Sequence, residues 1–314
     1  MTRKTQILDD VDEAAALLRA GGLVAFPTET VYGLGADARN KAAVEGIFRA
    51  KGRPQDNPLI VHVADAAAVA QVTGAAPPSA ERLLAAFAPG PLTVVVPRGE
   101  SLASAVSAGL DTVAVRIPAH PTALALLRAA AIPVAAPSAN RSGRPSATRW
   151  EAVREELDGR VDAILRGERS EVGIESTVVD CTADPPEVLR PGGLSLERLR
   201  TVIPDIRSAG KNHRASPGTR HRHYAPGARV LCVERPQPEA TAAYLGLEAP
   251  APGYALERVV PDLETYARDL YDFFRTADAA GCREIHCLVP PDEGLGRALR
   301  DRLTRAAEAS RAGD

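Results

Sequence analysis

Several cationic side chains stand beside glycine or proline where helices and strands are expected to end. Lys51 and Arg53 flank a glycine at the expected end of a helix, and Arg116 and Arg190 stand at the ends of expected strands. Arg144 lies in a loop rich in Ser, Gly and Pro. Fixed cations in loops around a sheet can neutralise the phosphates of a nucleoside triphosphate. Scattered surface arginines in an arginine-rich chain are the alternative interpretation.

A hydroxyl-bearing turn follows the first apolar stretch. Residues 23–26 are apolar, Thr28-Glu29-Thr30 comes next, and Gly33 and Gly35 close the segment. A buried strand that opens into such a turn can aim hydroxyl groups at a ligand, and the glycines let the backbone come close to it. A second polar loop, Ser138 to Asn140, follows another short strand. Its side chains either form a turn or bind a carboxylate or phosphate.

Other common catalytic patterns are missing from the sequence. There is no Walker A motif, no Ser-His-Asp order with a nucleophile elbow, and no pair of carboxylates of the glycosidase type. Neither the cysteines nor the carboxylates show metal-ligand spacing. We therefore expect no protein-held metal, and a Mg²⁺ would be held mostly by phosphate oxygens and water. Taken alone, His62 is more typical of a core histidine whose hydrogen bonds are satisfied within the protein.

The elements that must position these residues form an α/β pattern. Strands are expected near 23–26, 59–63, 92–96, 112–117, 132–136, 161–165, 176–180 and 187–190, and helices near 10–20, 40–52, 65–72, 79–87, 121–130, from 148 and from 195. The order lacks the strict alternation of a doubly wound fold, so we expect a mixed sheet with antiparallel pairs. Thr112 and Arg116 share one face of their strand. Thr148 and Glu151 predict a capping box.

Composition changes near residue 204. Residues 204–227 are rich in Pro, Gly, Ser, Arg and His, which predicts a basic linker after a first domain, 1–203. Residues 228–314 predict a small α/β domain with strands near 229–233 and 283–289, helices near 238–246 and 262–277, and a glycine loop before a last helix. This order resembles a Rossmann-like half. The full dinucleotide fingerprint is absent, so NAD is not inferred.

Bulk composition places the chain among ordinary globular proteins. Its 314 residues are 45% hydrophobic and 25% charged, with a formal net charge of −2. The whole molecule is therefore no obvious polyanion binder, and charge has to be interpreted locally. No apolar run approaches the roughly 18 residues of a membrane span. The N-terminal residues lead into an amphipathic helix and not into an apolar signal core. We expect a cytoplasmic protein without membrane contact.

Short motifs follow one another in register from about residue 7 to about residue 230. They are Ala25-Phe-Pro-Thr-Glu-Thr-Val-Tyr-Gly-Leu-Gly-Ala36, Lys51-Gly-Arg53-Pro54, Asn57-Pro-Leu-Ile-Val-His62, Pro89-Gly-Pro-Leu-Thr93, Asp111-Thr-Val-Ala-Val-Arg116, Ala136-Pro-Ser-Ala-Asn140, Glu175-Ser-Thr-Val178 and Leu189-Arg-Pro-Gly192. In this order they resemble the YrdC family of threonylcarbamoyl-adenylate synthases. Ser216-Pro-Gly and His223-Tyr-Ala-Pro226, followed by a further domain, resemble its long, two-domain form. Thr219 and His221 depart from the Met and Tyr that are usual in this segment.

The resemblance implies both a fold and a reaction. The fold would be a YrdC-like twisted mixed sheet with flanking helices, plus the smaller Rossmann-like C-terminal domain. The reaction would condense L-threonine, bicarbonate and ATP into L-threonylcarbamoyl-AMP, with release of pyrophosphate. A partner enzyme, a tRNA threonylcarbamoyl transferase, would then attach the activated group to the adenosine next to the anticodon of tRNA.

The resemblance also implies site residues, motif by motif. The L-threonine pocket would be lined by Thr28, His62, Arg116, Ser138 and Ser176. ATP would be held by Lys51, Arg53, Asn57, Thr112, Asn140, Ser146, Arg190 and Tyr224, the last as part of a linker that closes over the nucleotide as a lid. The ATP would be a substrate, accompanied by Mg²⁺ on its phosphates. No general base is apparent.

Two rival interpretations remain open at this point. A concave basic sheet can bind RNA as well as ATP, so the protein could be a non-catalytic RNA-binding module, and weak tRNA binding would suit either function. Aromatic residues are only 4% of the chain, which disfavours an RNA-binding sheet. A carbamoyl-transfer domain of the hydrogenase-maturation type would add zinc-finger cysteines, which this sequence lacks.

Overall fold

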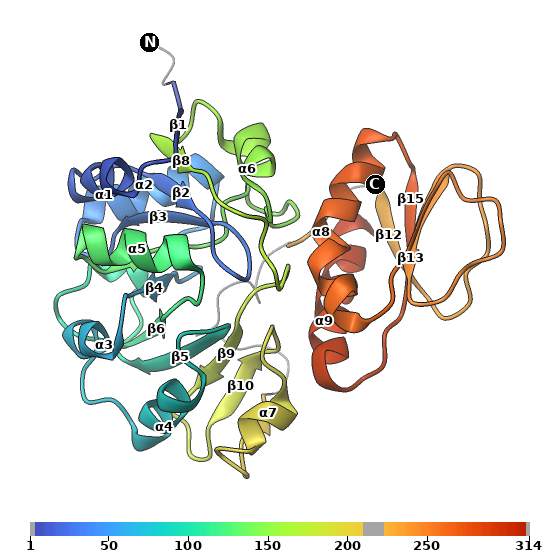
Figure 1. The fold of residues 1–314 in the computed structure, drawn as a ribbon. Coiled ribbons are helices and arrows are strands. Elements are labelled where there is room, and N and C mark those ends of the chain that lie inside the picture. Colours follow the sequence, from blue (N-terminus) through green and yellow to red (C-terminus); the bar gives the residue numbers. More distant parts are fainter. Residues whose placement is uncertain (1–3, 210–222, 312–314) are drawn as a thin grey trace.

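Two sheets and their flanking helices make up the computed structural model, which describes residues 4–209 and 223–311 (Figure 1). The larger sheet has 11 strands in the order β1-β8-β2-β3-β7-β4-β6-β5-β9-β10-β11. They are β1 Gln6–Leu8, β2 Val24–Phe26, β3 Gly33–Asp37, β4 Ile60–His62, β5 Leu92–Pro97, β6 Thr112–Arg116, β7 Val134–Ala135, β8 Ala163–Leu165, β9 Thr177–Asp180, β10 Glu187–Arg190 and β11 Arg207–Ser208. The sheet contains both parallel and antiparallel pairs, so the predicted mixed sheet is confirmed.

The helices of this part of the chain flank the larger sheet (Figure 1). They are α1 Val11–Arg19, α2 Lys41–Lys51, α3 Ala66–Val72, α4 Pro78–Phe87, α5 Pro121–Ala130, α6 Trp150–Leu157 and α7 Leu196–Arg200, with a short 3-10 turn, η1 Ser104–Val106. The side chains of Asp10 and Asn40 accept backbone N–H bonds at the starts of α1 and α2, as their residue types predict. Gly52 ends α2 at φ +63°, where a residue with a β-carbon would be strained.

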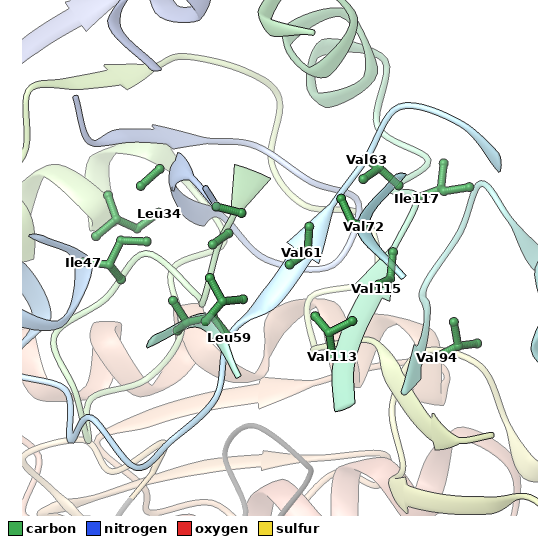
Figure 2. Packing of buried hydrophobic residues seen from close by; sticks show 14 of the residues in the cluster. Leu34, Ile47, Leu59, Val61, Val63, Val72, Val94, Val113, Val115 and Ile117 are labelled. Carbon is green, nitrogen blue, oxygen red and sulfur yellow. The ribbon is translucent and has the colours of Figure 1, made fainter. Parts of the chain in front are cut away.

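The core of the first domain fixes which side chains face the ligand side of the sheet. Leu59, Val61, Val113 and Val115 lie in one apolar cluster between the sheet and its helices (Figure 2). Alternation along β6 therefore turns Arg116 to the opposite face from Val115, as predicted. Burying an aliphatic side chain of this size stabilises the fold by about 1.5–3 kcal/mol, so a register slip that exposed these residues would be costly.

Gly33 and Gly35 belong to strand β3 and not to the predicted turn. β3 pairs antiparallel with β2, and the Phe26 ring of β2 lies across both glycines. A β-carbon on Gly35 would come within 2.9 Å of this ring and within 2.8 Å of Val134. The glycines therefore make room for protein side chains of the core, and only Gly33 also lines the pocket described below.

The smaller sheet is entirely parallel, in the order β12-β15-β13-β14. Its strands are β12 Arg229–Val233, β13 Ala242–Gly246, β14 Leu256–Val259 and β15 Glu284–Leu288, and its helices are α8 Leu263–Ala279 and α9 Gly294–Arg311. Both helices lie on the side of this sheet that faces the first domain (Figure 1). The arrangement agrees with the expected Rossmann-like half.

Two local predictions were wrong. Residues 242–246 form the buried strand β13 and not part of a helix, because all five residues are enclosed in the middle of a parallel sheet. The alanines of this segment favour a helix by intrinsic propensity, but their burial in the sheet overrides that preference. The predicted capping box is also absent: Arg149 is the N-cap of α6 and its side chain makes no capping hydrogen bond, while the Thr148 hydroxyl donates to Asp272 of α8.

The predicted linker, 204–227, is described only at its two ends. Its first residues extend the large sheet, because β11 pairs with β10 and Ile206 joins the core of the first domain. Thr219 and His221 lie outside the described residues, together with the middle of the linker. Tyr224 and Ala228 pack into the core of the second domain. The boundaries 1–203, 204–227 and 228–314 stay a prediction. None of the described helices is long and apolar enough to cross a membrane.

Candidate active site

A pocket opens where the ends of several strands of the large sheet meet the segment that leads into the second domain. Its empty volume is about 580 Å³, open mouth included. It is lined by Thr28, Thr30, Val31, Tyr32, Gly33, Arg53, Pro58, Leu59, Ile60, His62, Arg116, Ala136, Pro137, Ser138, Glu175, Ser176, Arg190, His223 and Tyr224. Residues from seven of the eight motifs, together with His223 and Tyr224, thus meet in one cavity, which no single motif could have established.

The structure gathers most of the predicted site residues around this pocket. The residues predicted to bind threonine all line it: Thr28, His62, Arg116, Ser138 and Ser176. Of those predicted to bind ATP, Arg53, Arg190 and Tyr224 line it. The others are not among the lining residues: Lys51, Asn57, Thr112, Asn140 and Ser146. Arg144, another cation of interest, is 46% exposed and pairs with Asp278 of α8 instead.

Arg116 is held rigidly in the wall of the pocket. Its Nη1 donates to Thr30 Oγ1 at 2.8 Å, and its Nε donates to the Gly90 carbonyl at 3.3 Å. Its Nη2 lies 2.6 Å from Oε1 of Glu29, in an ion pair whose side chains are only 4% and 8% exposed. A guanidinium fixed in this way presents a rigid fork that suits a ligand carboxylate. Glu29 and Thr30 belong to the first motif, but sequence reasoning had not given either a role.

His62 lies beside Arg116 because β4 and β6 run parallel with these two residues as register partners. Burial, together with the positive charge of Arg116, lowers the pKa of His62 to about 3. The ring is therefore neutral near pH 7 and can accept or donate one hydrogen bond without adding charge to the pocket. The Phe26 ring meets it edge-on at 6.0 Å between centroids.

Arg53 and Arg190 add two further positive charges to the lining of the pocket. Nη2 of Arg53 donates to the Pro58 carbonyl at 2.9 Å, and Nη2 of Arg190 donates to the Ser176 carbonyl at 2.8 Å. Burial lowers the pKa of Arg53 to about 10, and it also lowers the pKa of Arg190. Arg53 is still cationic at neutral pH, and two fixed guanidinium groups suit a polyphosphate.

Lys51 does not line the pocket but stabilises a loop that does. Its Nζ donates to the carbonyls of Ser138, at 2.5 Å, and of Asn140, and so ties the end of α2 to the loop after β7. Burial lowers the pKa of Lys51 well below its ordinary value, with the charge of Arg53 adding to the effect. Asn140 in turn donates to the carbonyls of Arg141 and Arg144. These residues shape the loop that carries Ser138 into the pocket.

Glu175 is the one carboxylate among the described residues that line the pocket. Ser146 Oγ donates to its Oε1 at 2.6 Å, which explains why Ser146 lies near the site without lining it. Tyr271 of α8 and Arg302 of α9 also reach this carboxylate. Neither residue carried a sequence signal, because each stands in an amphipathic helix where a tyrosine or an arginine is unremarkable.

A possible metal-binding group lies away from the pocket, in the second domain. Ligand atoms of Glu239, Glu284 and His286 are within 4.8 Å of one another. The contacts of His286 are accounted for within the protein, since its Nε2 lies 3.1 Å from Glu284 and its Nδ1 2.9 Å from the Tyr254 hydroxyl. We assign no ion to this group.

Comparisons with known proteins agree with this fold and pocket. Residues 16–192 match the family model Sua5_yciO_yrdC, described as telomere recombination, and residues 194–308 match the C-terminal domain of threonylcarbamoyl-AMP synthase. The chain is 44% identical over 320 residues to the threonylcarbamoyl-AMP synthase of Bacillus subtilis (strain 168), covering 95% of this chain and 92% of that protein. It is 42% identical over 315 residues to the protein of that name from Pyrococcus abyssi, covering 94% and 93%.

A solved structure extends the comparison to three dimensions. The crystal structure of P. abyssi Sua5 complexed with L-threonine is similar with a TM-score of 0.90 at 38% identity, and the match covers 99% of this chain and 98% of that chain. The large mixed sheet and its cation-lined pocket thus define an α/β protein of the YrdC class. With both family models matched in sequence, the chain belongs to the threonylcarbamoyl-AMP synthase family, in the two-domain form.

Proposed function

We propose that the protein condenses L-threonine, bicarbonate and ATP into L-threonylcarbamoyl-AMP and pyrophosphate, as an ATP-dependent nucleotidyltransferase. The observation that carries the proposal is that one pocket gathers residues suited to two different ligands. Arg116 and the neighbouring neutral His62 suit an amino acid, and Arg53 and Arg190, whose positive charges act on each other, suit a triphosphate. P. abyssi Sua5, which resembles this chain along its length, binds L-threonine.

The reaction asks the protein for positioning and charge neutralisation. The threonine amine adds to CO₂ derived from bicarbonate and loses a proton, which gives a carbamate. A carbamate oxygen then attacks the α-phosphorus of ATP, and pyrophosphate leaves in line. In this proposal Arg116 holds the threonine carboxylate, while Thr28, Ser138 and Ser176 supply hydroxyl groups around it. Arg53 and Arg190 neutralise the triphosphate.

Mg²⁺ would accompany the nucleotide. Among the described lining residues the only carboxylate is Glu175, and it is already paired with Arg302. The protein residues therefore suit a metal held by phosphate oxygens and water, which would screen the charge of the leaving pyrophosphate. Tyr224 lines the pocket at the described end of the linker, which supports the proposed lid role of that segment.

The product would have to be passed on before water destroys it. We propose that a tRNA threonylcarbamoyl transferase in the cytoplasm takes it up and modifies the adenosine next to the anticodon. The alternative of a non-catalytic RNA-binding module is not favoured, because the chain belongs to a family of synthases and its basic residues converge on a small pocket. Weak tRNA binding would be compatible with the synthase.

Detection of the product tests the proposal directly. Purified protein is incubated with ATP, Mg²⁺, L-threonine and ¹⁴C-bicarbonate, and the nucleotides are separated by chromatography. The proposal expects one labelled nucleotide with the mass of threonylcarbamoyl-AMP, which disappears when threonine or ATP is omitted. Absence of this product from folded protein, together with salt-sensitive RNA binding, would favour the RNA-binding module instead.

A further inference from the structure

A carboxylate in the wall of the pocket is neutralised from the other domain. Glu175 lines the pocket and is 7% exposed. Nε of Arg302, on α9, donates to its Oε2 at 2.6 Å, and the Tyr271 hydroxyl, on α8, donates to the same oxygen at 3.1 Å. Burial opposes the charge, but Arg302, Arg190 and the Ser146 hydrogen bond outweigh it and lower the pKa of Glu175 to about 2. Glu175 is therefore an anion in the pocket that the proposed function assigns to the triphosphate, which is also an anion.

Arg302 is fully enclosed at the boundary between the domains. Its exposed fraction is 0%, and its Nη1 donates to Asp301 Oδ2 at 2.6 Å. A charged side chain without access to water persists only where other groups compensate its lost hydration. The charge of the buried Arg302 is therefore compensated by two carboxylates, that of its neighbour Asp301 and that of Glu175 in the first domain.

Arg302 also fixes the tyrosine that closes one side of the pocket. Its guanidinium carbon lies 5.3 Å from the centre of the Tyr224 ring, and that ring stacks on Tyr271 at 5.5 Å between centroids. Tyr224 has a backbone φ of +67°, a left-handed conformation that costs free energy in a residue with a β-carbon. Contacts from α8 and α9 hold it in this conformation.

The second domain is attached to the loops around the pocket and not to a remote surface. Ion pairs join successive turns of one face of α8 to the first domain: Asp269–Arg169, Asp272–Arg149, Arg275–Glu156 and Asp278–Arg144. Gly173, just before Glu175, lies so close to α8 that an added β-carbon would be 2.2 Å from the Arg268 α-carbon. The domain that carries Arg302 is therefore fixed in place beside the pocket.

We propose that the second domain completes the active site by supplying Arg302 as a positioning residue, which neutralises Glu175 and keeps Arg190 committed to the triphosphate. This inference rests on the proposed function, because that function assigns Arg190, which acts on the charge of Glu175, to ATP. Without Arg302, the Glu175 carboxylate would repel the phosphates and attract the guanidinium of Arg190. Threonine, which the proposed function assigns to Arg116, would be affected much less.

Four variants test the inference in the full-length protein. Arg302→Met removes the charge and keeps most of the side-chain volume, and Arg302→Lys keeps the charge. The double variant Arg302→Met/Glu175→Gln removes both charges together. Arg297→Met is the matched control, because Arg297 also lies on α9 and pairs across the boundary, but its partners are Glu197 and Asp292 and not Glu175. Calorimetry measures dissociation constants for Mg²⁺–ATP and for L-threonine separately, without needing turnover.

The expected result is that ATP binding weakens only when Glu175 keeps its charge and position 302 loses its own. Arg302→Met weakens ATP binding about tenfold or more and threonine binding less than about threefold, whereas Arg302→Lys and the double variant stay within about threefold of wild type for both. Unchanged ATP affinity in Arg302→Met would overturn the inference, and so would a double variant as weak as the single one or an equal loss in Arg297→Met. If Arg302→Met does not fold, Arg302→Gln, which also removes the charge, takes its place under the same criteria.

These outcomes are separable from failure of the proposed function. If wild-type protein binds ATP but makes no threonylcarbamoyl-AMP, the proposed reaction is wrong, while the calorimetric comparison still reports on Arg302. If wild type makes the product and the variants show no charge-dependent ATP defect, the reaction stands and the role of Arg302 is wrong.

Discussion

Glu29 and Arg116 form a buried ion pair at the wall of the pocket, with 2.6 Å between Oε1 and Nη2. The pair means that the proposed ligand of the threonine carboxylate already has an anionic neighbour. Arg116 is therefore oriented before substrate arrives, and its removal has two separable consequences: lost substrate binding and an unpaired buried carboxylate.

Replacing Arg116 by Met should abolish threonine binding and leave ATP binding intact. The single variant should also lose about 3–5 kcal/mol of unfolding free energy, because Glu29 is left buried without its cation. In the double variant Arg116→Met/Glu29→Gln the stability loss should largely disappear while threonine still fails to bind. Urea unfolding and calorimetry measure the two effects; an equal loss of threonine and ATP affinity in the stable double variant would sink the assignment.

His62 predicts a pH dependence of stability. Its pKa is about 3 in the folded protein and 6.5 ordinarily, so the unfolded chain takes up the proton first as the pH falls. Stability from the neutral ring is fully present above pH 6.5 and is lost progressively towards pH 3. Between pH 7 and pH 5 the loss from this residue should be about 2 kcal/mol. The variant His62→Gln should lose less over the same interval, and an identical pH slope in both proteins would contradict the prediction.

Lys51 and Arg53 should behave differently although they share one motif. Lys51→Met removes the donor to the Ser138 and Asn140 carbonyls, so the loop loosens, and both threonine and ATP should bind several-fold more weakly. Arg53→Met should weaken ATP binding alone, by about tenfold or more. Separate titrations with the two substrates check this contrast, which would fail if Lys51→Met affected ATP only.

Tyr224 should contribute through its ring. The contacts it makes to Tyr271 and Arg302 are a ring stack and a cation–π contact. Tyr224→Phe retains both and should keep product formation within about threefold, whereas Tyr224→Ala should lower it about tenfold or more. Thermal unfolding controls for folding of the first domain. Wild-type turnover in Tyr224→Ala would show that the linker end plays no part in the reaction.

Much of the fold followed from local rules. The caps at Asp10 and Asn40 and the alternation of Val113, Val115 and Arg116 are local properties of the chain, and the structure agrees with them. Residues 242–246 did not follow, because their strand exists only through neighbours on both sides of a parallel sheet. Thr148 likewise had a local capping role available, but its hydroxyl bonds Asp272 across the domain boundary.

The candidate site also contains residues that local patterns predict and residues that only the folded chain brings together. Side chains that stand in short motifs on strands or loops, such as Arg116 and Ser138, could be predicted from the sequence to lie near a ligand. Thr112 shares a strand face with Arg116 but does not line the pocket, since it stands at the far end of β6. No sequence pattern indicated a role for Arg302, because its contact with Glu175 forms only when α9 packs against a distant part of the chain.

The most direct test of the central claim is pyrophosphate release by purified protein from ATP and bicarbonate, with L-threonine, with L-serine or with neither. The account predicts release that requires threonine and falls sharply with serine, because the pocket must place both the carboxylate and the hydroxyl-bearing side chain of the amino acid. Release that is equal with and without threonine, or no release from a protein that is folded and binds ATP, would contradict it.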